Sequence, residues 1–287
     1  MPACLARAAT SRRTETPGPG AVVTLSGMIH VRRPSAPRAA CALGLVASSL
    51  ALLVLTVGRA SSEIITLDEG KFIVSQHGKP ARVEEFYWDR SGDTLVVRAS
   101  SYLSADVQAG RRPDKTMELQ LGALDYSFVR YHSQHIMGPD SLRRGVETTP
   151  GDTLFTLWRE VNNRGEGDRV VLPPGRLFIL DPPLFTTFNL IARTLHGKTF
   201  DRRPVAVLIL GAPDSLVEVT VTDLGTETIR WGARPVGARK LLFADQQTRF
   251  TAWIAPDGRM LRLEQPESEI LVERQAPPPK RRAPHPK

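Results

Sequence analysis

The stretch DPPLFTTFNLIARTLHG, residues 181–197, decides how the whole chain is interpreted, because its apolar residues recur with the period of an α-helix. One stripe is formed by Leu184, Phe188, Ile191 and Leu195 and is widened by Phe185 and Ala192. Asp181 suits the N-cap, Pro182 suits the first helical position, and Gly197 suits the residue that follows the last turn. The sequence therefore predicts a helix over about 182–196, the one long helix after residue 62.

The segments around this helix carry the period of β-strands instead. Apolar and polar residues alternate in Thr116–Leu121 and in Leu216–Thr222, which places one face of each strand in the core. The run from Val205 to Leu210 is apolar throughout, which is typical of a strand covered on both faces. Turn signals with Gly, Pro and Asp recur at short intervals. We expect a mainly β (α+β) domain over residues 63–274, a curved antiparallel sheet or half-barrel of about ten strands that wraps one helix.

The run TAWIAPDGRMLRLEQPES, residues 251–268, predicts a β-hairpin near the C-terminus. Its turn is Pro256-Asp257-Gly258, in which Gly258 permits positive φ. Leu261 and Leu263 are expected on the buried face of the second strand, and the exposed face is expected to carry Met260, Arg262 and Glu264. Residues 103–113 have no clear period and are expected to form a loop.

The first 62 residues indicate export. Residues 39–57 form a 19-residue run without charge, preceded by three arginines and followed by the small residues of Gly58–Ser62. This is the pattern of a signal peptide over residues 28–62, cleaved after Ala60, or of a membrane anchor that keeps residues 39–57. Both alternatives stay open. Residues 1–27 are expected to be a disordered leader or a start assigned too far upstream.

Charge and cysteine content exclude several functions. The net charge is +8, of which residues 1–60 carry +6 and residues 280–287 carry +4, so residues 61–279 sum to −2. Such a body has no general attraction for phosphate backbones, and we expect no nucleic acid partner. Both cysteines, Cys4 and Cys41, precede residue 62, so the body has no disulfide, thiol nucleophile or Cys-bound metal. The tail, residues 275–287, is basic and Pro-rich and is expected to be disordered.

The sequence offers no strong catalytic or metal motif. His132 and His135 form an HxxH pattern, but their flanks favour a strand, in which an offset of three sends the rings to opposite faces. The acidic residues that could act in pairs are expected in turns or on exposed faces; they are Glu84, Glu85, Asp89, Asp93, Glu160 and Asp168. Known nucleophile, zinc and phosphate-binding signatures are missing from the sequence. We therefore predict no metal and no cofactor, and the sequence favours a non-enzymatic role.

The apolar stripe of the predicted helix allows two interpretations. In the first, its residues only pack the core. In the second, the helix leaves an apolar cavity at its edge. The residues that would line this cavity are Leu184, Phe185, Phe188, Ile191 and Leu195.

The strand–helix–strand unit around residues 181–197 and the closing hairpin WIAPDGRMLRLEQP, residues 253–266, resemble the half-barrel of bacterial lipoprotein-localisation factors and their envelope relatives. The resemblance covers about residues 63–274 and carries no catalytic signature. It implies a protein of the bacterial envelope, in the periplasm or at the outer face of the cytoplasmic membrane, that binds a lipid or acyl chain between helix and sheet. Two alternatives remain: an anchored assembly protein that acts through partner contacts, and a hydrolase without a recognisable motif.

Overall fold

The computed structural model describes residues 63–148 and 153–277, and the structural statements below concern these residues. Within them the domain is mainly β, with one sheet of fifteen strands. In chain order the strands are β1 (Ile64–Gln76), β2 (Lys79–Ser91), β3 (Thr94–Leu103), β4 (Lys115–Gly122), β5 (Phe128–Met137), β6 (Asp140–Thr148), β7 (Leu154–Val161), β8 (Arg164–Val171), β9 (Leu177–Leu180), β10 (Arg202–Ile209), β11 (Ser215–Trp231), β12 (Arg234–Ala244), β13 (Arg249–Ile254), β14 (Met260–Gln265) and β15 (Ile270–Arg274). The helices are α1 (Ser104–Gln108), α2 (Thr186–Leu195) and the 3-10 helix η1 (Pro266–Ser268).

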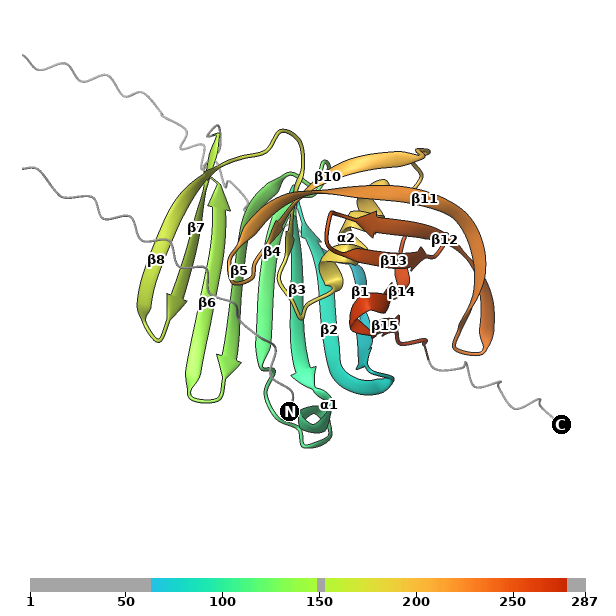
Figure 1. Cartoon of the computed structure of the whole chain (residues 1–287), viewed down its shortest axis with the longest axis horizontal. Coiled ribbons are helices and arrows are strands. Elements are labelled where there is room, and N and C mark those ends of the chain that lie inside the picture. The colour runs from blue at the N-terminus through green and yellow to red at the C-terminus, as the bar shows by residue number, and fades with distance from the viewer. Residues whose placement is uncertain (1–62, 149–152, 278–287) are drawn as a thin grey trace, which may run out of the picture. The chain divides into compact units, whose positions relative to one another are not determined.

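The first strand, β1, lies in the middle of the sheet, and the later strands are added first on one side of it and then on the other. The order is β8-β7-β6-β5-β4-β3-β2-β1-β15-β14-β13-β12-β11-β10-β9 (Figure 1). The chain therefore begins at the centre with β1, reaches one edge at β8, resumes at the other edge with β9, and returns to the centre. The antiparallel pairing of β1 with β15, with Phe72 opposite Arg274, joins the two halves.

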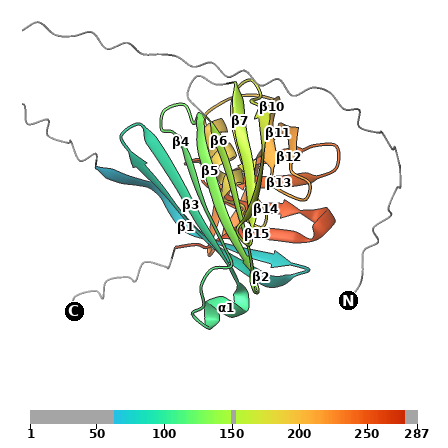
Figure 2. The ribbon, with the colours of Figure 1, turned by 90° about the vertical axis from the view of Figure 1, so that its left-hand side faces the viewer.

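The short link between β8 and β9 requires the sheet to curl. In a flat sheet, fourteen strand spacings would separate the two edges by about 67 Å. The chain has only residues 172–176 between Val171 and Leu177, a path of at most about 22 Å. The two edges must therefore approach each other. In the turned view, the first strands and the last strands run in clearly different directions (Figure 2).

The number of strands exceeds the prediction of about ten because several strands lack an apolar period. Strand β8, RGEGDRVV, is exposed along almost its whole length and pairs with β7 through its backbone. The predicted loop over residues 103–113 contains the five-residue helix α1. The alternation predicted for Thr116–Leu121 is confirmed, since Met117, Leu119 and Leu121 are buried.

One pair of strands departs from the antiparallel pattern. Strand β9 pairs in parallel with β10, with Leu177 opposite Ala206 and Leu180 opposite Ile209. A parallel pair requires a crossover connection, and α2 is that crossover. The apolar run Val205–Leu210 thus lies next to the edge strand of the sheet.

Helix α2 is shorter than predicted at its N-terminus. It begins at Thr186, not at residue 182, and Asp181 is not its N-cap. The carboxylate of Asp181 is bound by side chains of the sheet instead, as described below. The C-terminal prediction is confirmed, because Gly197, with φ of +70°, follows the cap residue His196.

The predicted hairpin near the C-terminus is confirmed, with one correction. Strands β13 and β14 pair around the turn at Pro256-Asp257-Gly258, and a bulge shifts the register between Trp253 and Ile254. The bulge brings Met260 into the main core and directs Leu261 to a separate cluster with Trp253. Met260 is therefore buried, and Leu261 does not share the face of Leu263, because the bulge interrupts the alternation that was assumed.

Helix α2 packs on the inner face of the curled sheet, and nine of its ten residues are buried. Its Phe188 ring lies 5.5 Å from the Phe243 ring of β12 and 4.7 Å from the Phe250 ring of β13. A helix that is buried all round must be enclosed by the rest of its domain. The predicted signal or anchor, residues 28–62, lies outside the described residues, as does most of the tail. Among the helices that the structure describes, none has the length and hydropathy to cross a membrane.

Candidate functional site

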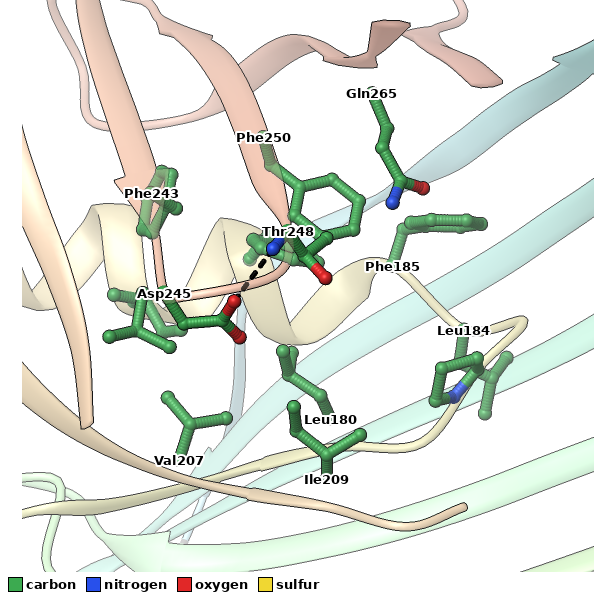
Figure 3. Close-up of a pocket in the computed structure, with 14 residues that line it drawn as sticks. Leu180, Leu184, Phe185, Val207, Ile209, Phe243, Asp245, Thr248, Phe250 and Gln265 are labelled. Carbon is green, nitrogen blue, oxygen red and sulfur yellow. Dashed lines mark hydrogen bonds between the residues drawn. The ribbon is translucent and has the colours of Figure 1, made fainter. Parts of the chain in front are cut away.

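An apolar cavity of about 250 Å³ lies between α2 and the sheet, at the N-terminal end of the helix (Figure 3). Four of the five residues singled out from the sequence line it: Leu184, Phe185, Phe188 and Ile191. Leu195 does not; it borders a separate hollow on the surface near Lys198. The physical reason is distance along the helix, because Leu195 lies one turn beyond Ile191.

The other walls of the cavity come from the sheet and were missed by sequence reasoning. The apolar residues from the strands are Leu180, Val207, Ile209, Val219, Phe243 and Phe250. Pro182 and three polar residues, Asp245, Thr248 and Gln265, complete the lining. The alternation of Leu216–Thr222 places Val219 on an inner face, but only the curl of the sheet brings that face opposite the helix.

The loop before α2 forms one wall of the cavity, and hydrogen bonds to the buried carboxylate of Asp181 fix this loop. Asp181 is 2% exposed. It accepts hydrogen bonds from Lys115 Nζ at 2.5 Å, from Tyr131 Oη at 2.6 Å and from Ser133 Oγ at 2.7 Å. These donors stand on β4 and β5, whereas Asp181 follows β9. The cluster therefore ties the loop across the interior to the opposite part of the sheet.

The buried charges near Asp181 alternate in sign: Lys115 binds Asp181, and Arg144 lies 3.7 Å from Asp181 and 3.7 Å from Asp214. Lys115 also donates to the carbonyl of Pro182 at 2.6 Å. Burial lowers the pKa of Lys115, and Asp181 acts in the opposite direction. Burial raises the pKa of Tyr131 well above its usual value, and the nearby Asp181 carboxylate raises it further. Arg144 donates to the carbonyl of Gly211 at 2.7 Å, which fixes the start of the β10–β11 connection as well.

A second buried acid caps the helix itself. Glu84 of β2 is 0% exposed, and its two carboxylate oxygens accept the backbone N–H of Phe185 at 2.7 Å and of Thr186 at 2.9 Å. These N–H groups are among those that a helix start leaves without partners. Burial raises the pKa of Glu84 to about 7, against the opposing effect of the two backbone hydrogen bonds. Trp88, four residues further along β2, donates to the hydroxyl of Thr186 at 3.4 Å.

The placement of Glu84 corrects the sequence prediction, which put it on an exposed face or in a turn. In β2 the inner face carries Glu84, Phe86 and Trp88, all buried, at a spacing of two. Glu84 thus continues an apolar stripe, and that alternation was a signal available in the sequence. Its neighbour Glu85 faces outward and pairs with Lys71 at 2.5 Å.

A third polar group anchors the middle of the helix. Asn189 of α2 is 0% exposed; its amide donates to Asp68 at 3.1 Å and its carbonyl accepts the backbone N–H of Met260 at 2.8 Å. Asp68 is bound in turn by Arg274 of β15 at 2.5 Å. Both hydrogen-bonding ends of the Asn189 side chain are therefore satisfied, which removes the cost of burying an amide.

The two histidines form no common site. His132 lies on the outer face and contacts Glu147 at 2.7 Å, while His135 lies 3.8 Å from Asp114. The opposite orientation predicted for a strand is confirmed by their register partners on β4, Glu118 and Lys115, which face outward and inward. Among the residues that the structure describes, no group of three or more His, Cys, Asp or Glu side chains is placed to hold a metal ion.

Comparisons with known proteins give a likeness to a solved structure. No protein-family model matches the sequence, and no curated protein matches it. The structure is similar to that of a beta-barrel-like protein of a domain of unknown function (DUF1849) from Brucella abortus, with a TM-score of 0.41 and 10% sequence identity. The likeness covers 72% of this chain and 94% of that protein.

Proposed function

We propose that this protein is a non-enzymatic protein of the bacterial envelope that binds an apolar or lipid-like ligand between α2 and the inner face of the sheet. The observation that carries the proposal is the cavity of about 250 Å³ beside the N-terminal half of α2. Ligand pockets are concave, mostly apolar and carry a few polar groups, and their volumes begin at about 300 Å³. This cavity has the composition of such pockets, and its volume of about 250 Å³ lies just below that range.

The cavity is formed by a wall that the fold holds in place. The loop before α2 is fixed by Asp181, and the first turn of α2 by Glu84. Buried polar groups of this kind do little for net stability when they replace apolar packing, but they specify one arrangement. A cavity wall that is already ordered before binding reduces the conformational entropy that is lost when a ligand binds. The two buried acids therefore support a preformed site.

The chemistry of the lining supports binding without catalysis. Asp245 is the single ionisable residue that lines the cavity among those the structure describes. Acid–base catalysis of hydrolysis uses two groups that face the same bond. One carboxylate among apolar side chains, with Thr248 and Gln265 as its polar neighbours, is more suitable for orienting a ligand than for reacting with it.

The volume limits the ligand to a single apolar chain of moderate length. For a ligand of nine heavy atoms such as 1-octanol, an intermediate ligand efficiency gives a dissociation constant on the order of 0.1 mM. A longer chain would need to extend beyond the cavity or to widen it by moving α2.

The location is part of the proposal and rests on the sequence. Residues 39–57 supply an apolar segment for export, and they would associate the protein with a membrane if they are retained. The half-barrel likeness to lipoprotein-localisation factors, drawn from the helix and the closing hairpin, points to the same compartment.

Native mass spectrometry of the full-length chain, purified from the cells that make it, tests the proposal. We expect an adduct with the mass of an apolar small molecule. We expect that adduct to be lost in Val207→Phe, in which the new ring fills the cavity, and kept in Val171→Phe, whose residue is 66% exposed on β8. Spectra without an adduct in all three proteins would contradict the proposal.

A further inference from the structure

The lining of the cavity carries one formal charge among the described residues, and that charge is negative. Asp245 follows β12, and its carboxyl group lies beside the apolar side chains of Leu180 and Val207 (Figure 3). One carboxylate oxygen, Oδ1, accepts the backbone N–H groups of Gln247 and Thr248, each at 2.7 Å. These bonds close a turn that fixes the orientation of the carboxylate.

The remaining acceptor capacity of Asp245 is available to a ligand. The Asp245 side chain makes two hydrogen bonds to other described residues, and both are accepted by Oδ1. A carboxylate has about four lone-pair sites, so Oδ2 keeps its own acceptor capacity. The group is half-buried, and water reaches it less freely than a surface carboxylate. A hydrogen-bond donor on a ligand would find an oriented acceptor there.

Among the residues that the structure describes, none of those lining the cavity is a cation. Arg249 stands between the lining residues Thr248 and Phe250, so the alternation of β13 directs it to the opposite face. Lys115 is bound to Asp181 and to the Pro182 carbonyl. Arg144 donates to the Gly211 carbonyl and lies 3.7 Å from both Asp181 and Asp214.

From these observations, and resting on the proposed function, we infer that Asp245 selects the polar end of the ligand. The ligand is an apolar chain that ends in a cationic or neutral hydrogen-bond donor, such as an amine or an alcohol, and not in a carboxylate. A carboxylate end would face Asp245 with like charge and would find no cation to bind. The two other polar lining residues, Thr248 and Gln265, can bond to either kind of donor.

The experiment compares three probes with the same chain: octylamine, 1-octanol and octanoate. Each is titrated calorimetrically into the full-length chain at pH 7 and low salt. We expect octylamine to bind more tightly than octanoate by at least about tenfold, because the ammonium donates to Asp245 while the carboxylate is repelled by it. 1-Octanol should fall between them, and the ratio should shrink at high salt.

The decisive variant is Asp245→Asn. Its amide oxygen can keep the two turn hydrogen bonds while the charge is removed. In this variant octylamine and octanoate should bind within about twofold of each other, and 1-octanol should bind as in the wild type. Asp201→Asn, an exposed acid just before β10, is the matched control and should leave the wild-type ratio unchanged.

The outcomes separate the two proposals. If all three probes bind but octanoate binds as tightly as octylamine, the selection by Asp245 is wrong and the proposed function stands. If none of the probes binds, the proposed function fails and this inference fails with it. A preference for octylamine that survives Asp245→Asn would assign the selection to another group and overturn the inference.

Discussion

The carboxylate of Glu84 accepts the backbone N–H of Thr186 at 2.9 Å, so a strand supplies the cap of the buried helix. The two residues are 102 positions apart in the chain. Because the same carboxylate also holds Phe185, whose side chain lines the cavity, the cap fixes the cavity wall together with the helix.

Removal of the cap should destabilise the fold. Glu84→Ala leaves two buried N–H groups without acceptors, and we expect the free energy of unfolding to fall by about 2–4 kcal/mol. Glu85→Ala is the control, because Glu85 is the adjacent outward-facing acid and its pair with Lys71 is partly exposed. That change should cost less than about 1 kcal/mol. Urea unfolding measures both. Equal losses in the two variants would contradict the role of Glu84.

Glu84 should also make stability depend on pH near neutrality. Its pKa is about 7 in the fold against an ordinary value of 4.5, so the folded state binds more protons than the unfolded state between these values. Stability from this group is therefore present below about pH 4.5 and is lost as the pH rises to about 7. The loss is roughly 3 kcal/mol.

The measurement is the free energy of unfolding of wild type minus that of Glu84→Gln, from pH 4.5 to pH 8. The glutamine does not titrate, so this difference should decrease as the pH rises through about 7 and level off towards pH 8. Carboxylates whose pKa is lowered, such as Glu118 and Asp223, contribute equally to both proteins and cancel. A difference that does not change with pH would show that Glu84 keeps one protonation state throughout.

The Asp181 cluster should behave as a coupled unit. Asp181→Asn leaves the Lys115 ammonium buried without its counter-charge, and we expect a loss of about 3–5 kcal/mol. Adding Lys115→Met removes the unpaired charge, so the double variant should be more stable than Asp181→Asn alone. The amide oxygen at position 181 can still accept from Tyr131 and Ser133. A double-mutant cycle by urea unfolding measures the coupling. Additive losses would contradict the buried pair.

Enlarging a side chain should distinguish the cavity from the packed core. Val207 and Val146 are both 0% exposed, but only Val207 lines the cavity. Val207→Phe should change the free energy of unfolding by less than about 1 kcal/mol, because the ring enters existing space. No cavity adjoins Val146 in the lining described above, so Val146→Phe should lower the free energy of unfolding by about 1–3 kcal/mol. Thermal or urea unfolding of the two variants gives the comparison. Similar losses would indicate that the cavity is filled in solution by its own side chains.

The local patterns of the sequence predicted the buried helix, the alternating strands and the closing hairpin, because period and turn chemistry are local properties. Strand β8 and the parallel pairing of β9 with β10 were missed, since the side chains of a single segment say little about which strands pair through their backbones. The start of α2 was placed too early because Asp181 and Pro182 are residues typical of a helix start. In the structure the Asp181 carboxylate instead binds Lys115 of β4.

The part of the candidate site that lies on the helical stripe was predictable, because it also follows from a local period. The apolar stripe predicted over residues 184–195 included Leu184, Phe185, Phe188 and Ile191, although the first two precede the helix itself. The opposite wall comes from β9 to β13, and its place depends on how far the sheet curls. Glu84 could have been recognised from its alternation with Phe86 and Trp88, but its partner on α2 could not.

Binding of an apolar ligand beside α2 can be measured by calorimetric titration of 1-octanol into the full-length wild type, Val207→Phe and the exposed control Val171→Phe. We expect one binding site, with a dissociation constant on the order of 0.1 mM, in the wild type and the control, and none in Val207→Phe. Because all three proteins carry residues 39–57, binding to that apolar segment would be common to all. Equal binding in the three proteins, or no binding in the wild type, would contradict a binding site beside α2.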